Sequence, residues 1–297
     1  MPSSHSGKKN IAGEMTPDER LRTAQLCDLR MLKELVRICD EHGFTYYLSA
    51  GTLLGAVRHG GFIPWDDDID VRMPREDYEK LLRVLPDELS PEYRLGHFYY
   101  GQLEHVYVLR LYDRRVKIER INATKTKVTP AWISVLPLDG MPEGKIRQWI
   151  RKKHLLWRRM WLMISVFDEI VTVKKKRRKL ERVIISLVQK TGIQKKVSWR
   201  KNWQKLDRAM KEYPAEGAKL LINTMSTYKY KDIMPREIYG SGKMYRFEDA
   251  EFRGPEKADE FLTKLYGDYM ELPPVEKRNH HMSEVVYISP ELKEIRK

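Results

Sequence analysis

An acidic run directly before a short segment of alternating polarity sets the strongest limit on how this chain can fold. Four carboxylates fall within the five residues from Asp66 to Asp70. Like charges this close repel one another, and a bound cation removes that cost. Residues two apart in a strand point to the same side, so the spacing predicts that Asp68 and Asp70 project together from a strand over 69–72. Such oxygen ligands suit Mg²⁺, which commonly takes one or two carboxylates plus substrate phosphates.

The segment upstream of the acidic run predicts a phosphate-binding turn. An aromatic strand over 44–48 is followed by Gly51 and Thr52, which begin a short helix that reaches His59. The N–H groups and the dipole of a helix N-terminus attract phosphate. Joined to Asp-x-Asp on the next strand, this turn indicates phosphoryl or nucleotidyl transfer. The alternatives are a solvated acidic loop or a Ca²⁺ site, but the central Gly and closing Glu of an EF-hand loop are missing.

Apolar periodicity predicts the elements around this motif. A long helix begins after the capping pair Thr16 and Glu19 and ends at Gly43. Two cysteines, Cys27 and Cys39, are too few for a disulfide framework or a zinc site. The remaining pattern predicts helices over 75–84 and 256–266, and strands over 106–112, 115–121, 132–138 and 247–252.

Charge divides the chain into parts. Residues 145–211 carry 22 Lys or Arg and 4 Asp or Glu, which leaves 34 basic and 38 acidic residues elsewhere. Such an asymmetry is a local property and not a global one. We therefore predict a disordered tail over 1–14, a core over 15–143, a basic helical insert over 144–212, and a C-terminal part over 213–297 that packs on the core.

The basic insert predicts a helical surface that lies on an anionic membrane. It holds five of the seven tryptophans, and Trp157 and Trp161 fall on one helical face. Basic charge with interfacial aromatic residues suits such a surface, and the eight mostly apolar residues over 160–167 are too few to span a bilayer. The alternatives are tryptophans that pack on the body of the protein, or a nucleic-acid surface. We expect the membrane as partner and no nucleic acid.

The motif residues resemble the LicD family. Residues 51–59 read Gly-Thr-Leu-Leu-Gly-Ala-Val-Arg-His, residues 61–70 read Gly-Phe-Ile-Pro-Trp-Asp-Asp-Asp-Ile-Asp, and residues 266–278 look like the end of the family's sequences. The resemblance covers roughly residues 25–140 and 220–282. It implies an α+β fold: a nucleotidyltransferase-like core with a mixed sheet, flanking helices and the basic helical insert.

The same resemblance implies a reaction. Members transfer a phospho-alcohol, typically phosphocholine, from a CDP-alcohol donor such as CDP-choline. The implied acceptor is a sugar hydroxyl of a cell-surface glycan, such as teichoic acid or lipopolysaccharide, or of its lipid-linked precursor. Fukutin-type proteins resemble the same core and use CDP-ribitol. A lipid-linked acceptor leads us to expect a cytoplasmic protein, peripheral at the inner face of the membrane.

One position departs from the family pattern, which reads roughly Ile-Asp-Ile-Phe-Pro-Leu-Asp. Here Ser134 stands where the Asp is expected, so the resemblance implies that a metal ligand or a base is missing. Asp139, five residues further on, is the candidate replacement. Two rival functions stay open: nucleotidyl transfer from a nucleoside triphosphate, and a weakly active surface-binding scaffold.

The expected site residues have three roles. Asp68, Asp70 and Asp139 are expected to be catalytic, and Mg²⁺ is expected on Asp67, Asp68 and Asp70. Arg58 pairs either with phosphate or with the acidic loop, and Trp65 either contacts a ligand or packs. The expected substrate-binding residues are Gly51, Thr52, Arg58, Trp65, Lys277, Arg278 and His281.

Overall fold

The computed structural model describes residues 10–100, 108–120, 128–170, 179–278 and 283–292. Within them the strands are β1 (Tyr47–Leu48), β2 (Asp70–Pro74), β3 (Tyr93–Gly96), β4 (Leu109–Arg120), β5 (Val128–Met141), β6 (Leu220–Ile222), β7 (Ile233–Pro235), β8 (Lys243–Phe247), β9 (Ala250–Gly254) and β10 (Ser283–Ile288). The α-helices are α1 (Pro17–His42), α2 (Ala50–His59), α3 (Arg75–Glu88), α4 (Lys145–Ser165), α5 (Phe167–Ile170), α6 (Lys179–Thr191), α7 (Trp199–Lys211), α8 (Arg236–Tyr239) and α9 (Ala258–Tyr266). Short 3₁₀ turns are η1 (Ala12–Glu14), η2 (Phe98–Tyr100), η3 (Ile193–Lys195), η4 (Lys229–Asp232) and η5 (Val275–Lys277).

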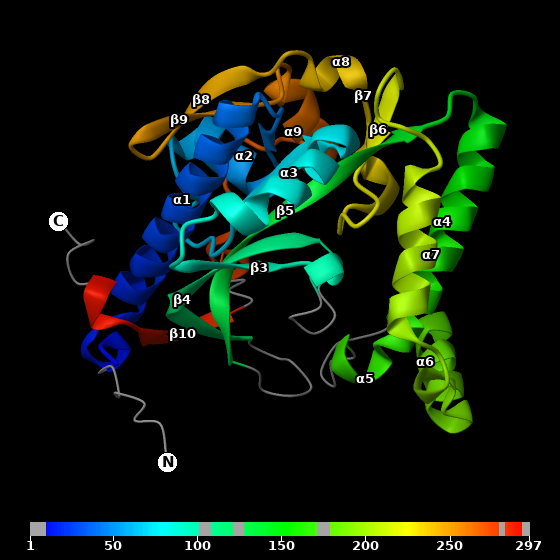
Figure 1. The fold of residues 1–297 in the computed structure, drawn as a ribbon, viewed down its shortest axis with the longest axis horizontal. Coiled ribbons are helices and arrows are strands. Elements are labelled where there is room, and N and C mark those ends of the chain that lie inside the picture. Colours follow the sequence, from blue (N-terminus) through cyan, green and yellow to red (C-terminus); the bar gives the residue numbers. More distant parts are fainter. Residues whose placement is uncertain (1–9, 101–107, 121–127, 171–178, 279–282, 293–297) are drawn as a thin grey trace.

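One mixed sheet organises the molecule (Figure 1). Its main path runs β1-β2-β5-β4-β10, with β3 also paired to β4, and with β6 and β7 continuing from β5. β2 and β5 are parallel, whereas β1 and β2, and β4 and β5, are antiparallel. The hairpin β8–β9 forms a separate small sheet. This arrangement confirms the predicted α+β class with flanking helices.

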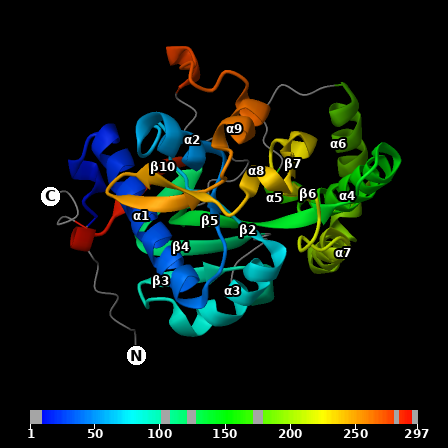
Figure 2. The same cartoon turned by 90° about the horizontal axis from the view of Figure 1, so that it is seen from above.

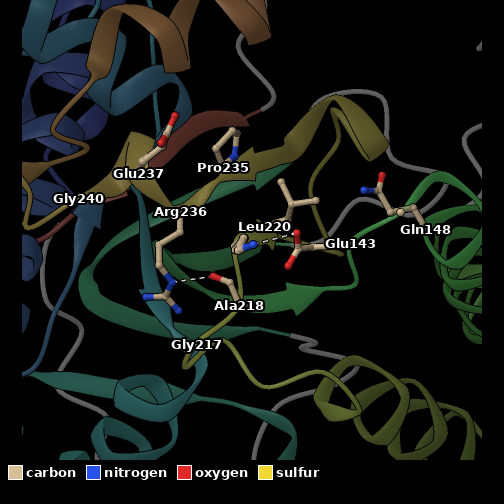
Figure 3. A pocket seen from close by; sticks show the side chains of 11 residues that line it. Glu143, Gln148, Gly217, Ala218, Leu220, Pro235, Arg236, Glu237 and Gly240 are labelled. Carbon is tan, nitrogen blue, oxygen red and sulfur yellow. Dashed lines mark hydrogen bonds and ion pairs between the residues drawn. The ribbon is translucent and has the colours of Figure 1, made fainter.

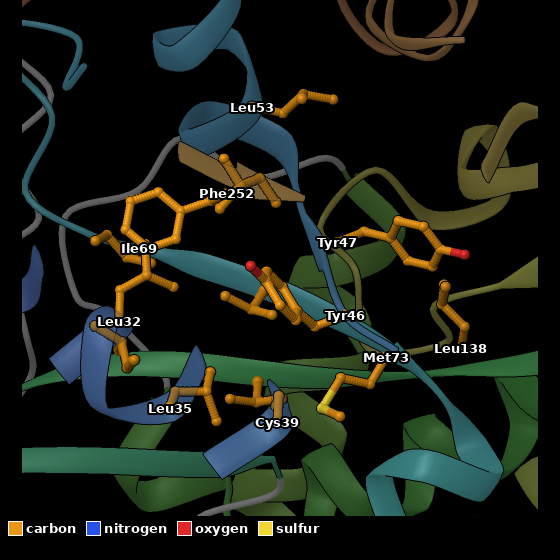
Figure 4. Close-up of a cluster of buried hydrophobic side chains, with 14 of the residues drawn as sticks. Leu32, Leu35, Cys39, Tyr46, Tyr47, Leu53, Ile69, Met73, Leu138 and Phe252 are labelled. Atoms are coloured by element: carbon orange, nitrogen blue, oxygen red, sulfur yellow. The ribbon is translucent and has the colours of Figure 1, made fainter. Parts of the chain in front are cut away.

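Helices α1 and α3 cover one face of the sheet, and the main core lies beneath them. Figure 4 shows Leu32 and Leu35 of α1 in the same cluster as Ile69 and Met73. The capping pair forms as predicted, because the backbone N–H of Glu19 donates to the Thr16 hydroxyl at 3.3 Å and the Glu19 carboxylate accepts in return. Gly43 ends the helix with a φ of +66°, a conformation that glycine adopts without strain.

Two strand predictions are wrong where a side chain reshapes the backbone. β4 is one strand and not a pair, with a register shift between Asp113 and Lys117. Asp113 is fully buried and accepts from the backbone N–H and the guanidinium of Arg115, so the expected turn becomes a bulge. The predicted strand over 247–252 is instead the end of β8, a turn at Glu248 and Asp249, and the start of β9, and Glu248 has a φ of +60°. Residues 106, 107 and 121 lie outside the described part.

Two predicted boundaries, the end of a strand and the end of the N-terminal tail, differ in the structure. β5 continues through Gly140, since the absence of a side chain there lets the carbonyl of Pro214 approach closely. The tail predicted over 1–14 is ordered at its end: Ile11 and Ala12 are 2% exposed and pack with β10. The Ile11 N–H donates to the Ile288 carbonyl at 3.2 Å. Residues 1–9 lie outside the described part.

The helices of the basic segment gather at one end of the molecule, away from α1 and the hairpin β8–β9 (Figures 1 and 2). α4 and α7 pack side by side around Leu155, Leu162, Trp203 and Leu206. None of the helices in the described segments has the length and apolar character needed to cross a bilayer.

Candidate active site

The first residue of β2 is held in place by the start of α2. Thr52 is 3% exposed, and its hydroxyl accepts from the backbone N–H of Asp70 at 2.9 Å. The N–H of Ser49 donates to the Asp70 carbonyl at 3.1 Å. These contacts position Asp70, and the expected contact of Thr52 with phosphate stays a prediction.

Gly51 is required for a close approach by the acidic loop. A Cβ atom at this position would lie 2.6 Å from Oδ2 of Asp66, which is shorter than such contacts normally are. The carbonyl of Asp66 accepts from the side-chain amide of Gln25 at 2.9 Å, so α1 holds the loop from the other side. The acidic run thus folds against the N-terminal turn of α2, as its place in the sequence suggested.

The carboxylates of the loop are electrostatically unfavourable when ionised. Burial, together with the charges of Asp67 and Asp70, raises the pKa of Asp66 to about 7. Asp68 is an exposed residue, but the protein around its carboxyl group and the neighbouring Asp70 still raise the pKa of this group. Burial also raises the pKa of Asp70, against the opposing charge of Arg72. A cation bound here would remove a cost that the fold maintains.

The donor set fits a divalent cation held by two carboxylates. Among the residues described, no three His, Cys, Asp or Glu side chains converge closely enough to hold a metal ion. The structure therefore does not assemble Asp67, Asp68 and Asp70 as one three-carboxylate set. Mg²⁺ commonly uses one or two carboxylates and completes its shell with water and substrate phosphates, a requirement that Asp68 and Asp70 can meet.

The charged loop gives a pH dependence that can be measured. A carboxyl whose folded pKa lies above its unfolded value binds a proton in the folded state that the unfolded state has already lost. Between about pH 4 and pH 7 the free energy of unfolding of the metal-free protein should therefore fall as pH rises. Thermal melts in EDTA from pH 5 to pH 7.5 test this. Asp66→Asn should flatten the slope, and a wild-type melting temperature that rises across this window would contradict the assignment.

Asp139 lies apart from the acidic loop. It is 1% exposed, and its two oxygens accept from the Arg75 guanidinium at 2.7 and 2.9 Å. Along β5 it lies five residues beyond Ser134, which pairs in register with Asp70; five residues of strand span roughly 16 Å. The expectation that Asp139 replaces the missing carboxylate is not supported, because it is committed to a buried ion pair.

Three of the expected substrate-binding residues, Arg58, Trp65 and Arg278, lie near the C-terminal segment. Arg58 donates to the carbonyl of Tyr269, and not to the acidic loop. The Arg278 guanidinium lies 5.3 Å from the centre of the Trp65 ring, so Arg278, Trp65 and Arg58 are linked through the C-terminal segment. Lys277 is the last residue of η5. His281 lies outside the described residues.

Two features near the acidic loop were not predicted from the sequence: a buried Asp on α1 and a pair of tyrosines. Asp28 on α1 is 2% exposed, and burial, together with Asp68, raises its pKa well above its usual range. The hydroxyl of Tyr228 donates to that of Tyr266 at 2.7 Å, and burial and then this neighbour raise the pKa of Tyr266. Helical spacing placed Asp28 near the apolar stripe of α1, and a buried Asp within such a stripe is the signal that was available.

A pocket of about 800 Å³ lies elsewhere, between the start of α4 and the strands β6 and β7 (Figure 3). Arg236 donates to the Ala218 carbonyl at 2.7 Å, and Lys219 pairs with Glu143 at 3.2 Å. Two of its basic side chains, Arg236 and Lys219, are thus paired with other residues that line the pocket. The pocket contains none of the predicted site residues.

Comparisons of the sequence with known proteins give a family and named relatives. The family described as "LicD/FKTN/FKRP, nucleotidyltransferase domain" matches residues 43–133. The lipopolysaccharide cholinephosphotransferase LicD of Haemophilus influenzae is 31% identical over 284 residues, which are 90% of this chain and 98% of that protein. The ribitol 5-phosphate transferase FKRP of Homo sapiens is 46% identical over 55 residues, which are 17% of this chain and 11% of that protein.

The cholinephosphotransferase relative, of which 98% is aligned, places this α+β core, with its acidic loop against a helix N-terminus, in the phosphotransferase class. The chain belongs to the LicD family.

Proposed function

We propose that this protein transfers phosphocholine from CDP-choline, with Mg²⁺, to a sugar hydroxyl of a cell-surface glycan or of its lipid-linked precursor. The observation that carries the proposal is the acidic loop that folds against Gly51 and ends at Asp70, the first residue of β2, whose N–H donates to the Thr52 hydroxyl at 2.9 Å. The name of the Haemophilus influenzae relative, a lipopolysaccharide cholinephosphotransferase aligned over nearly its whole length, supports the choice of alcohol and the kind of acceptor.

The chain's own residues would act mainly by positioning. Asp68 and Asp70 would hold Mg²⁺, which supplies charge neutralisation at the diphosphate. The hydrogen bond from the Asp70 N–H to Thr52 fixes the start of β2. The acceptor oxygen would form a bond to the β-phosphorus while the bond from that phosphorus to the bridging oxygen breaks, so CMP leaves and the hydroxyl proton passes to solvent.

Product analysis tests this proposal against the nucleotidyltransferase rival. Purified protein would be incubated with Mg²⁺, a lipopolysaccharide acceptor, and either CDP-choline, CDP-ribitol or CTP. CMP released from CDP-choline supports the proposal, and CMP from CDP-ribitol alone would move it to another alcohol. Pyrophosphate released from CTP would replace it with nucleotidyl transfer. No cleavage of any donor would favour the scaffold reading.

We further propose that the basic helices rest on an anionic membrane, on the inner face and in the cytoplasm. One side of α4 packs on α7 through Arg151, Leu155 and Leu162, which are at most 3% exposed. The other side presents apolar residues at helical spacing, with Lys and Arg on both flanks. The exposed residues are Ile146 (77%), Trp149 (61%), Ile150 (56%), Leu156 (49%) and Trp157 (52%). This pattern suits an interfacial helix, and a lipid-linked acceptor would make the location useful.

Vesicle co-sedimentation tests this surface. We expect the wild type to sediment with vesicles that contain anionic lipid and to be released by salt, since each basic residue near such a surface contributes about 1 kcal/mol. The triple change Ile146→Ser, Trp149→Ser and Ile150→Ser should weaken binding by at least about tenfold. A matched control changes Met270, Leu272 and Val275, which are also exposed, to Ser. Equal binding by both triple variants would contradict the proposal.

A further inference from the structure

We propose that Arg110 binds the phosphate oxygens of the diphosphate donor, at a subsite on the sheet next to Asp70 that Ser134 completes. The inference rests on the proposed function for the identity of the donor, but its geometry is independent of which alcohol the donor carries. The ligand chemistry is a diphosphate, which a guanidinium can bind through two parallel hydrogen bonds.

The register of three neighbouring strands brings these residues together. Asp70 on β2 pairs with Ser134 on β5, and Ser134 pairs with Arg110 on β4. Residues in register on neighbouring strands project from the same face of a sheet. Asp70, Ser134 and Arg110 therefore form a row across that face, although 64 residues separate Asp70 from Ser134 in the sequence.

Within the described part of the protein, the side chains around the row are less buried on this face than on the other. Ser134 and Arg110 are half-buried, and so are Trp132 and Leu136 beside them. The residues that alternate with them are fully buried, on the side that α1 and α3 cover: Leu109, Leu111, Ile133 and Val135. A donor bound at Asp70 can thus extend over Ser134 toward Arg110 without displacing the core.

The Arg110 guanidinium is held in place but keeps hydrogen-bonding capacity. It lies 4.3 Å from the centre of the Trp132 ring, a stacking contact that orients a guanidinium without using its N–H groups. Its buried Nε has no hydrogen-bond partner in the described part of the protein. A buried donor left in this state costs free energy, and a phosphate oxygen would satisfy it.

The serine at position 134 affects whether the charge of Arg110 is available to a ligand. The Ser134 hydroxyl and the charge of Arg110 both act on Asp70 and oppose the rise in its pKa that burial causes. A carboxylate at position 134 would lie between the two and pair with Arg110. With Ser there, the guanidinium remains available to an anionic ligand, so the departure from the family pattern is a change of binding chemistry and not a loss of the site.

Isothermal titration of the full chain tests the proposal, with Mg²⁺ and two probes, CDP-choline and inorganic pyrophosphate. Arg110→Met should weaken the binding of both by about 10- to 100-fold, since a hydrogen bond to a charged group contributes about 1.5–3 kcal/mol. Arg110→Lys should restore part of the loss, because it keeps the charge but not the planar fork. Arg114→Met, an exposed position on the same strand, is the matched control and should bind like the wild type.

The outcomes separate this inference from the proposed function. Pyrophosphate binding that needs Arg110, without CMP release from CDP-choline, supports the subsite and overturns the choice of donor. Wild-type affinity in Arg110→Met overturns the subsite whether or not CDP-choline is cleaved. Should Arg110→Met not fold, Arg110→Lys is compared instead, and equal affinity then overturns the subsite. Ser134→Asp should weaken pyrophosphate binding at least fivefold, and tighter binding in this variant would overturn the proposal in favour of a missing third carboxylate.

Discussion

Asp70→Asn is expected to reduce Mg²⁺-dependent CMP release from CDP-choline by about 10³-fold, the scale seen when charge stabilisation at a reacting group is lost. The same change should raise the melting temperature of the metal-free protein at pH 7.5. Burial raises the folded pKa of Asp70, so its ionised form stabilises the unfolded state relative to the folded one above that pKa, and a neutral amide removes this cost. Initial rates and thermal melts in EDTA measure the two effects.

A control and a contrary result accompany this prediction. Asp249→Asn makes the same chemical change at a residue whose partner is Lys33 on the surface, and it should leave the rate within twofold of wild type. An Asp70→Asn protein that retains more than a tenth of the wild-type rate would show that Asp70 is not a metal ligand in the reaction.

Asp139→Ala is expected to lower the free energy of unfolding by about 3–5 kcal/mol, because it leaves the buried Arg75 guanidinium without its main partner. We expect a loss of stability near the lower end of this range, because two carboxylates remain near Arg75: Glu79 at 3.3 Å and Asp207 at 3.5 Å. The rate per folded molecule should change less than the stability. Urea unfolding at pH 7.5 and active-site titration of the folded fraction separate the two effects.

The double variant Arg75→Met with Asp139→Leu provides the matched comparison. Replacing both members of a buried ion pair by apolar residues of similar volume is often close to neutral, so most of the stability should return. A stable Asp139→Asn protein that has lost turnover would contradict the structural role and would restore the catalytic one.

The sequence predicted those parts of the fold that depend on neighbours along the chain. The capping pair Thr16 and Glu19 and the glycine at position 43 act within one turn of the helix, so their pattern was sufficient. The bulge in β4 was read as a turn, since the burial of Asp113 that reverses that reading comes from tertiary packing. Hairpin β8–β9 was missed because its turn residue Glu248 is held by hydrogen bonds from Arg22 and from the Phe62 N–H, which lie far away in the sequence.

The candidate site shows the same division. The close approach at Gly51 was accessible from the sequence. The same-face relation of Asp68 and Asp70 stays a prediction, since β2 begins at Asp70 and Asp68 precedes the strand. The roles of Ser134 and Arg110 depend on strand register, which joins residues from β2, β5 and β4 and cannot be obtained from one segment. Asp139 was misjudged for the same reason, since its partner Arg75 begins α3.

We propose above that this chain places phosphocholine on a sugar hydroxyl in a metal-dependent reaction. Mass spectrometry of a lipopolysaccharide acceptor, after incubation with the protein, CDP-choline and Mg²⁺, tests it most directly. We expect a mass increase of one phosphocholine per modified site, absent in EDTA and in Asp70→Asn. An acceptor that gains a nucleotide instead, or that gains phosphocholine equally well in EDTA, would contradict it.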